Sequence, residues 1–148
     1  MNKLLYLSNS IFPSKEANSI HVMKMCQAFS ENGYKVTLLA PKHKNNYNID
    51  LFEYYGVKKI FRIKFISYLN IPKLWLFSYA INVSRFIAKN KYDIIYGRDL
   101  RSCFISSINN KSLSISYESH KPYEKYNLVD KLIMMLLIKK SNFKKFIV

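Results

Sequence analysis

Residues 4–40 read LLYLSNSIFPSKEANSIHVMKMCQAFSENGYKVTLLA and predict one βαβ unit. Leu4 to Leu7 is a short apolar run, which is typical of a strand buried on both faces of a parallel sheet. The next segment repeats its apolar residues at helical spacing: Val22, Met25, Cys26 and Phe29. We expect Ser19 to cap the start of this helix and Gly33 to follow its end. Lys35 to Ala40 then forms a second strand.

The remainder of the chain continues to alternate strands and helices. Further strands are expected at 58–66, 93–96 and 113–117, and a last one starts at 146. Helices are expected at 50–55, 72–90, 100–109 and 128–140, the second of them opening with Pro72. Such alternation forms a parallel sheet with helices on both faces. The sequence therefore predicts an α/β fold of Rossmann-like type.

Length and composition fit one domain, since the chain has 148 residues of which 49% are apolar. Cys26 and Cys103 lie far apart in predicted helices, so we expect buried thiols and neither a disulfide nor a metal cluster. No apolar run is long enough for a signal peptide or for a membrane span. These features favour a cytoplasmic location.

The charge balance is the strongest compositional signal, because 24 Lys and Arg against 9 Asp and Glu give a net charge of +15. Such an excess indicates an anionic partner, which is a nucleic acid, an anionic membrane face or a phosphorylated small molecule. The lysines are scattered and no aromatic reading motif accompanies them, which argues against nucleic acid. A base bias of the genome is the alternative explanation.

Several motifs that bind cofactors are missing from the sequence. Neither G-x-G-x-x-G nor G-x-x-x-x-G-K-[ST] occurs, so a dinucleotide fingerprint and a P-loop are both absent. The sequence also lacks a G-x-S-x-G nucleophile elbow and any spacing typical of metal ligands. We therefore expect no cofactor and no metal.

Polar residues gather where three of the predicted strands end. Ligands of open parallel sheets bind beyond the carboxyl ends of the strands, where loops and helix N-termini meet. The candidate ligand-binding residues at this edge are Asn18, Ser19, His21, Arg98, Asp99, Glu118 and His120.

Most of these candidates have a structural alternative. Asn18 and Ser19 also fit a helix cap, and His21 fits a solvent-facing place on the first helical turn. Arg98 and Asp99 also fit a surface ion pair, with Asp99 capping the next helix. The sequence leaves these alternatives open.

Two predicted helices carry more apolar surface than one buried face requires. Beside its main stripe, the helix at 72–90 has a second one: Trp75, Tyr79 and Phe86. Leu132 to Ile138 is apolar without interruption and is flanked by lysines. Either this surface is buried in the core of the sheet, or it contacts a membrane interface or a second domain.

Three stretches carry a family resemblance. They are Phe12-Pro13-Ser14 with Ala17-Asn18-Ser19-Ile20-His21-Val22 and Gly33-Tyr34-Lys35-Val36-Thr37-Leu38, then Asp93-Ile94-Ile95-Tyr96 with Arg98-Asp99, then Tyr117-Glu118 with His120. In this order they resemble the N-terminal domain of family-4 glycosyltransferases with the GT-B fold. The resemblance covers essentially the whole chain.

The resemblance implies one half of a metal-independent enzyme that has two Rossmann-like domains and retains anomeric configuration. Residues 1–148 would be the acceptor-binding domain, truncated before the C-terminal domain that binds the nucleotide sugar, and inactive alone. His120 would position donor and acceptor, although from the residues alone it also fits a structural loop position. Arg98 and Glu118 would line the acceptor pocket. Many members carry Gly-Gly in the first loop, where this chain has Ala17-Asn18-Ser19.

The prediction is thus the acceptor side of a glycosyltransferase that acts on a cell-envelope or lipid-linked glycan. Its expected partners are the glycan acceptor, the missing C-terminal domain and an anionic membrane surface, at the inner face of the membrane. The alternative is a non-catalytic basic module that binds a protein, a membrane or a nucleic acid.

Overall fold

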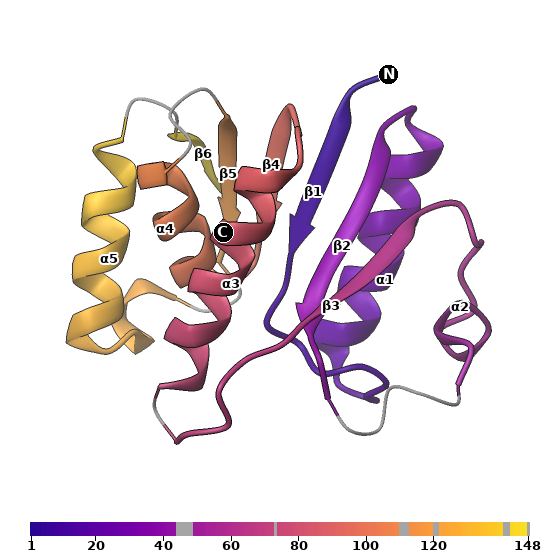
Figure 1. The fold of residues 1–148 in the computed structure, drawn as a ribbon, viewed down its shortest axis with the longest axis horizontal. Helices are drawn as coiled ribbons and strands as arrows, with labels where there is room; N and C mark the ends of the chain where they lie inside the picture. Colours follow the sequence, from indigo (N-terminus) through magenta and orange to yellow (C-terminus); the bar gives the residue numbers. More distant parts are fainter. Residues whose placement is uncertain (44–48, 73, 110–112, 120–121, 141–142, 148) are drawn as a thin grey trace.

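The computed structural model describes residues 1–43, 49–72, 74–109, 113–119, 122–140 and 143–147, and within them six parallel strands form one sheet (Figure 1). The strands are β1 (Lys3–Leu7), β2 (Lys35–Pro41), β3 (Arg62–Ile66), β4 (Ile94–Gly97), β5 (Ser114–Glu118) and β6 (Phe143–Ile147). Their spatial order is β3-β2-β1-β4-β5-β6, the order of a Rossmann fold. The predicted fold class is therefore confirmed.

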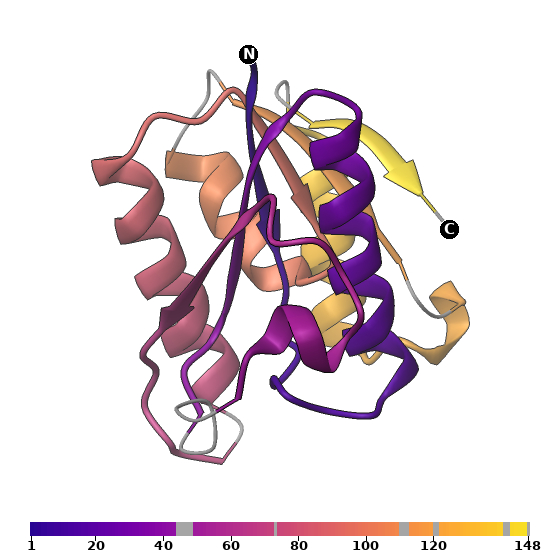
Figure 2. The same cartoon turned by 90° about the vertical axis from the view of Figure 1, so that its right-hand side faces the viewer.

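The helices occupy both faces of the sheet, as predicted. They are α1 (Ala17–Glu31), α2 (Leu51–Tyr54), α3 (Trp75–Lys89), α4 (Leu100–Asn109) and α5 (Leu128–Ile138), with a short 3₁₀ turn, η1, at Tyr123–Lys125. Figure 2 shows α1 and α3 on opposite sides of the strands. Side chains of β1 alternate between the two layers: Leu4 and Tyr6 pack with α1 and α2, whereas Leu5 and Leu7 pack with α3, α4 and α5.

The start of α1 differs from the prediction. The cap position is Glu16, whose side chain makes no capping hydrogen bond, so the prediction that Ser19 caps the helix is wrong. Ser19 lies inside the first turn, where it is buried and its hydroxyl donates to the carbonyl of Ile11 at 3.3 Å. Ser19 therefore stands too far into the helix to cap it, and its hydroxyl holds the preceding loop instead. Gly33 follows the helix with φ of 85°, as expected.

Three further elements begin three or more residues from their predicted starts. Strand β3 begins at Arg62, four residues after the predicted start at Lys58. Helix α3 begins at Trp75, because Pro72 belongs to a turn in which the N–H of Leu74 donates to the carbonyl of Ile71. Strand β6 begins at Phe143, three residues before the predicted start, since Phe143 already pairs with Ile115 of β5. Val148 lies outside the described residues.

The two apolar helices behave differently. The second stripe of α3 is covered within the domain, because Tyr79 is fully buried and Phe86 packs against the core. Helix α5 buries Ile133, Met134 and Leu137 but leaves most of its other apolar side chains exposed. Burial in the core thus explains the second stripe of α3, although Phe77 and Ile81 of this helix remain exposed, and it explains only part of the apolar surface of α5.

The junction between β4 and α4 is closely packed. Cys26 and Cys103 are both free and fully buried, as predicted, and burial raises the pKa of each thiol. A Cβ atom at Gly97 would collide with the sulfur of Cys103. Glycine at the end of β4 therefore lets α4 approach the sheet.

Candidate functional site

The candidate site lies at the carboxyl edge of the sheet, where the neighbouring strands β1, β4 and β5 end. The register pairs Leu7 with Gly97 and Gly97 with Tyr117. The residues that follow these three positions consequently emerge next to one another. They include Arg98 and Glu118, both of which the sequence singled out.

Glu118 is the centre of a polar cluster at this edge. One of its oxygens, Oε1, lies 3.1 Å from Nε2 of His21 and 3.4 Å from Nε of Arg98. Its other oxygen accepts a hydrogen bond of 3.0 Å from the hydroxyl of Tyr96. One carboxylate therefore joins α1, β4 and the loop after β4, and the structure brings three of the candidate residues, His21, Arg98 and Glu118, into direct contact.

Arg98 is a buried cation with few partners for its N–H groups. Its side chain is only 9% exposed, and Glu118 is its one ion-pair partner among the residues that the structure describes. Within the same residues, Nε and Nη1 of Arg98 are buried and make no hydrogen bond. A guanidinium has five N–H donors, and buried donors without acceptors are costly. The arrangement leaves donor capacity at the edge of the sheet.

Two tyrosines complete the cluster. Tyr6 and Tyr96 occupy paired positions on β1 and β4, with ring centroids 5.2 Å apart. Burial, followed by the charge of Glu118, raises the pKa of both phenols well above their usual value. Both hydroxyls therefore stay protonated near neutral pH. Sequence reasoning missed these residues because they stand within strands, although tyrosines at equal register were a usable signal.

A cleft with a volume of about 420 Å³ opens beside the start of α1. Six of its eight lining residues are of polar type: Asn9, Ser10, Ile11, Ser14, Glu16, Asn18, Ser19 and Trp75. Asn18 donates to the hydroxyl of Ser10 at 2.6 Å, while its buried Oδ1 makes no hydrogen bond within the described chain. Asn18 and His21 are three residues apart on one helix, so the cleft adjoins the Glu118 cluster.

Trp75 reaches the cleft because α3 is tied to the end of β1. The hydroxyl of Tyr79 donates to the carbonyl of Ser8 at 2.7 Å, and Trp75 lies one helical turn before Tyr79. The indole ring also packs against Tyr68, with ring centroids 5.4 Å apart. An aromatic ring beside polar side chains suits the mixed apolar and hydroxylated faces of a sugar.

The remaining candidates make local contacts or lie outside the described structure. Asp99 is buried at the start of α4 and accepts hydrogen bonds from the N–H and the hydroxyl of Ser102. Burial raises the pKa of this carboxyl. Ser19 holds the first loop, as described above. His120 lies outside the described residues.

The described part of the chain has neither a metal site nor a helix that could cross a membrane. No group of three His, Cys, Asp or Glu side chains there is placed to hold a metal ion. Likewise, none of the described helices combines the length and the apolar character that crossing a bilayer demands.

The family follows from a comparison of the sequence with known families. A family model described as "Glycosyl transferase 4-like" matches residues 10–116, which is most of the chain. The chain belongs to this family. The match contains Asn18, His21 and Arg98 and ends two residues before Glu118. None of the curated protein sequences matches this glycosyltransferase-like chain significantly.

Solved structures share the fold of this glycosyltransferase-like chain at low sequence identity. Sucrose-phosphate synthase from Thermosynechococcus elongatus aligns with a TM-score of 0.68 at 12% identity, over 96% of this chain and 41% of its own. The lipopolysaccharide outer core galactosyltransferase WaaB aligns with 0.58 at 12%, over 96% and 44%. A putative UDP-N-acetylglucosamine 2-epimerase from Listeria monocytogenes aligns with 0.54 at 11%, over 91% and 37%. The chain thus spans less than half of each structure.

Proposed function

We propose that this chain is the acceptor-binding half of a retaining glycosyltransferase, which transfers a sugar from a nucleotide sugar to a cell-envelope or lipid-linked glycan in polysaccharide biosynthesis. The observation that carries the proposal is the contact of Glu118 with His21, Arg98 and Tyr96, beside a polar cleft at the carboxyl edge of the sheet. Membership of the glycosyltransferase family supports it.

The residues at this edge suit the hydroxyl groups of an acceptor sugar. Each hydroxyl both donates and accepts hydrogen bonds. Glu118 offers carboxylate oxygens as acceptors, and the guanidinium of Arg98 offers donors. The single O–H of Tyr96 is bonded to Glu118, so its phenol oxygen offers an acceptor. Asn18 offers an amide oxygen that has no partner within the described chain. The proposal assigns these side chains to acceptor binding, with Trp75 beneath an apolar sugar face.

The donor belongs, in this proposal, to a second domain. The sequence has no dinucleotide fingerprint and no P-loop that would cradle a diphosphate. Residues 1–148 alone are then expected to bind an acceptor without transferring sugar to it. A cytoplasmic location, at the inner face of the membrane, is part of the same proposal.

Nuclear magnetic resonance titration of the chain tests this assignment. A lipid-diphosphate-linked sugar with a short prenyl chain should shift the amide signals of Asn18 and Arg98, whereas UDP-glucose should leave them unchanged. Replacing Glu118 with glutamine should weaken binding by about tenfold, since a hydrogen bond to a charged group contributes about 1.5 kcal/mol or more. Glu31→Gln on the outer face of α1 is the matched control.

Two outcomes contradict the proposal. Sugar transfer from UDP-glucose by the chain alone would refute its inactivity. Binding of UDP-glucose in the cleft, without any binding of glycan, would refute the acceptor assignment.

The net charge of +15 favours one competing function, a non-catalytic module that binds nucleic acid or protein. A salt titration separates nucleic-acid binding from acceptor binding. The logarithm of the affinity for nucleic acid falls steeply and linearly with the logarithm of the salt concentration. Binding of an uncharged glycan through hydrogen bonds changes little over the same range.

A further inference from the structure

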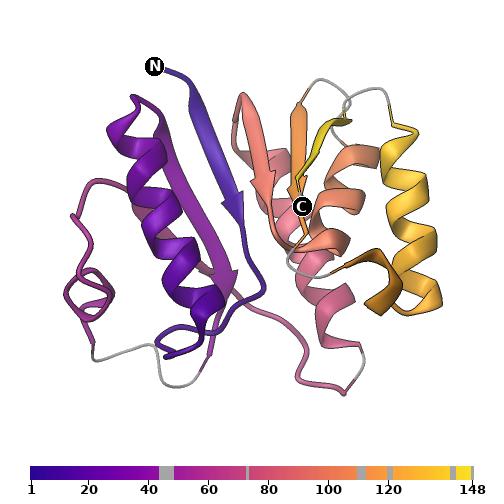
Figure 3. The same ribbon diagram turned by 180° about the vertical axis from the view of Figure 1, so that it is seen from behind.

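Helix α5 presents an apolar surface to solvent. It is the outermost helix on its side of the molecule in Figures 1 and 3. We call the following exposed side chains the outer face of α5: Leu128, Val129, Leu132, Met135, Leu136 and Ile138. Leu128 is 84% exposed, Leu132 57% and Met135 51%. A helix that covers a sheet normally has polar residues on this side.

The polarity of α5 is reversed with respect to that norm. Its one carboxylate, Asp130, points inward and is buried, with Oδ1 2.7 Å from Nη2 of Arg101 on α4. The guanidinium of Arg101 in turn lies 5.0 Å from the ring centre of Phe77 on α3. Since Asp130 is bound inside the helical layer, α5 exposes leucines and no carboxylate.

Basic side chains border this apolar surface. Lys125 precedes the helix and Lys139 follows it, and both are exposed. Lys131 lies on α5 itself, with its ammonium 5.3 Å from the ring centre of Tyr123. A complementary partner must therefore combine apolar material with negative charge. The interface of a bilayer that contains anionic lipids has both properties.

A second copy of the chain fits this surface poorly. Two outer faces in contact would bring the flanking lysines of both copies together, and each copy carries a net charge of +15. Like charges at such an interface oppose association. The charge around α5 thus favours a lipid surface over self-association.

We propose that the outer face of α5 docks on the surface of an anionic bilayer, with the helix lying in the plane of the interface. Leucine and methionine side chains enter the boundary between headgroups and acyl chains, and the lysines contact lipid phosphates. Helix α5 follows the loop that leaves the carboxyl edge of the sheet after Glu118. One end of α5 and the candidate site therefore lie on the same side of the docked molecule.

Flotation with lipid vesicles tests the docking. Vesicles made of equal parts phosphatidylglycerol and phosphatidylcholine should carry the chain upward, and vesicles of phosphatidylcholine alone should carry much less. The double variant Leu132→Gln, Met135→Gln should bind the mixed vesicles at least about tenfold more weakly, because it removes apolar area from the interface. Lys139→Gln should weaken binding by about fivefold.

Ile60→Gln is the matched control, because Ile60 is also an exposed apolar residue, 47% accessible, but lies beside α2 and β3. Circular dichroism of each variant verifies that the fold is kept. Failure of the wild-type chain to float with anionic vesicles overturns the proposal, as does equal binding by the double variant and the control. A dimer that the double variant abolishes, without vesicle binding, assigns the face to a second copy and also overturns it. The docking rests on the membrane location in the proposed function, and its failure would remove that location. No sugar is present in this assay, so its outcome leaves the acceptor assignment to be tested by the glycan titration.

Discussion

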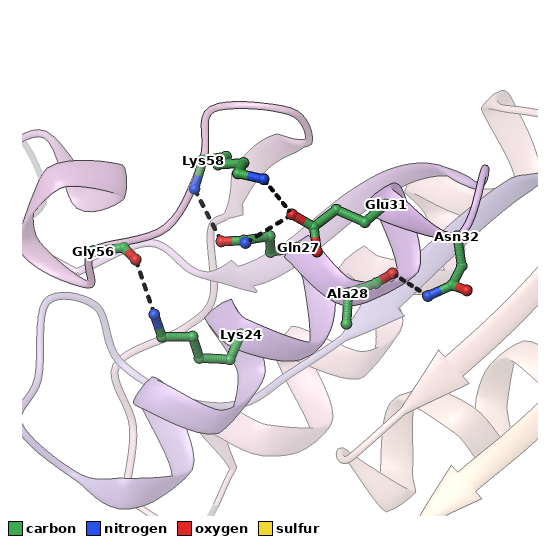
Figure 4. A network of polar contacts seen from close by, with 7 residues as sticks. All are labelled: Lys24, Gln27, Ala28, Glu31, Asn32, Gly56 and Lys58. Atoms are coloured by element: carbon green, nitrogen blue, oxygen red, sulfur yellow. Dashed lines mark hydrogen bonds and ion pairs between the residues drawn. The ribbon is translucent and has the colours of Figure 1, made fainter.

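The outer faces of α1 and α5 differ in what they offer to solvent. On α1, Lys24, Gln27 and Glu31 form a polar network with the segment after α2 (Figure 4). Lys58 donates to Gln27 through its backbone and to Glu31 through its ammonium group, at 3.0 and 2.8 Å. On α5 the corresponding surface is apolar and the carboxylate is turned inward. The outer face of α1 is thus largely polar, whereas that of α5 is apolar.

The largest expected effect concerns the ion pairs of these two regions. Asp130→Asn removes the counter-charge of the mostly buried Arg101, and we expect a loss of about 3 kcal/mol in the free energy of unfolding. Glu31→Gln disrupts an exposed ion pair on α1, and we expect an unchanged free energy of unfolding. Urea denaturation of both variants measures the difference. Equal losses would remove the contrast between the two faces.

The next largest expected effect is the loss of stability when Gly97 or Gly33 is replaced with alanine. Gly97→Ala places a Cβ against the sulfur of Cys103, and overpacking of this kind costs about 2 kcal/mol. Gly33→Ala, in the turn after α1, meets no neighbour and costs about 1 kcal/mol through its positive φ alone. Urea denaturation of these variants tests whether the collision with Cys103 causes the loss in Gly97→Ala. Adding Cys103→Ala should recover part of the loss in Gly97→Ala, whereas an additive double variant would exclude the steric explanation.

The smallest effect concerns two aspartates that cap helices. The backbone N–H of Phe52 lowers the pKa of Asp50 at the exposed start of α2. Burial raises the pKa of Asp99 at the start of α4. The folded-state contribution of Asp50 is present above its unfolded pKa and is lost as pH falls through its folded pKa. For Asp99 the sign is opposite, because the folded state binds the proton more tightly, so stability falls as pH rises from the unfolded to the folded pKa.

Carbon-13 titration of the two carboxyl groups checks the directions. Unfolding measurements of Asp99→Asn across the same acidic range should show the variant gaining on the wild type as pH rises. A folded-state pKa of Asp99 at or below its unfolded value would contradict burial as the dominant cause.

The sequence predicted those features that depend on local pattern. Leu4 to Leu7 and Asp93 to Tyr96 were recognisable as strands because short apolar runs are typical of parallel sheets. The meeting of Arg98 and Glu118 followed from the rule that parallel strands end at one edge. The role of Ser19 was not predictable, since its hydroxyl bonds to a loop carbonyl eight residues away.

The sequence also could not predict the direction in which some side chains point. Leu132 to Ile138 is apolar all round, so its periodicity could not indicate which side packs on the sheet. The pairing of Asp130 with Arg101 fixes that choice, and it joins residues of two helices. Trp75 appeared as a residue in need of a partner, whereas the bond from Tyr79 to Ser8 places it beside the cleft.

Trp75 also gives the molecule an optical property. It is the single tryptophan of the chain, it lines the cleft, and it packs against Tyr68. The indole emission of the unlabelled protein therefore comes from the cleft alone. A molecule that enters the cleft displaces water from this ring and alters the colour and intensity of its fluorescence, so occupancy can be followed continuously in solution without attaching a dye.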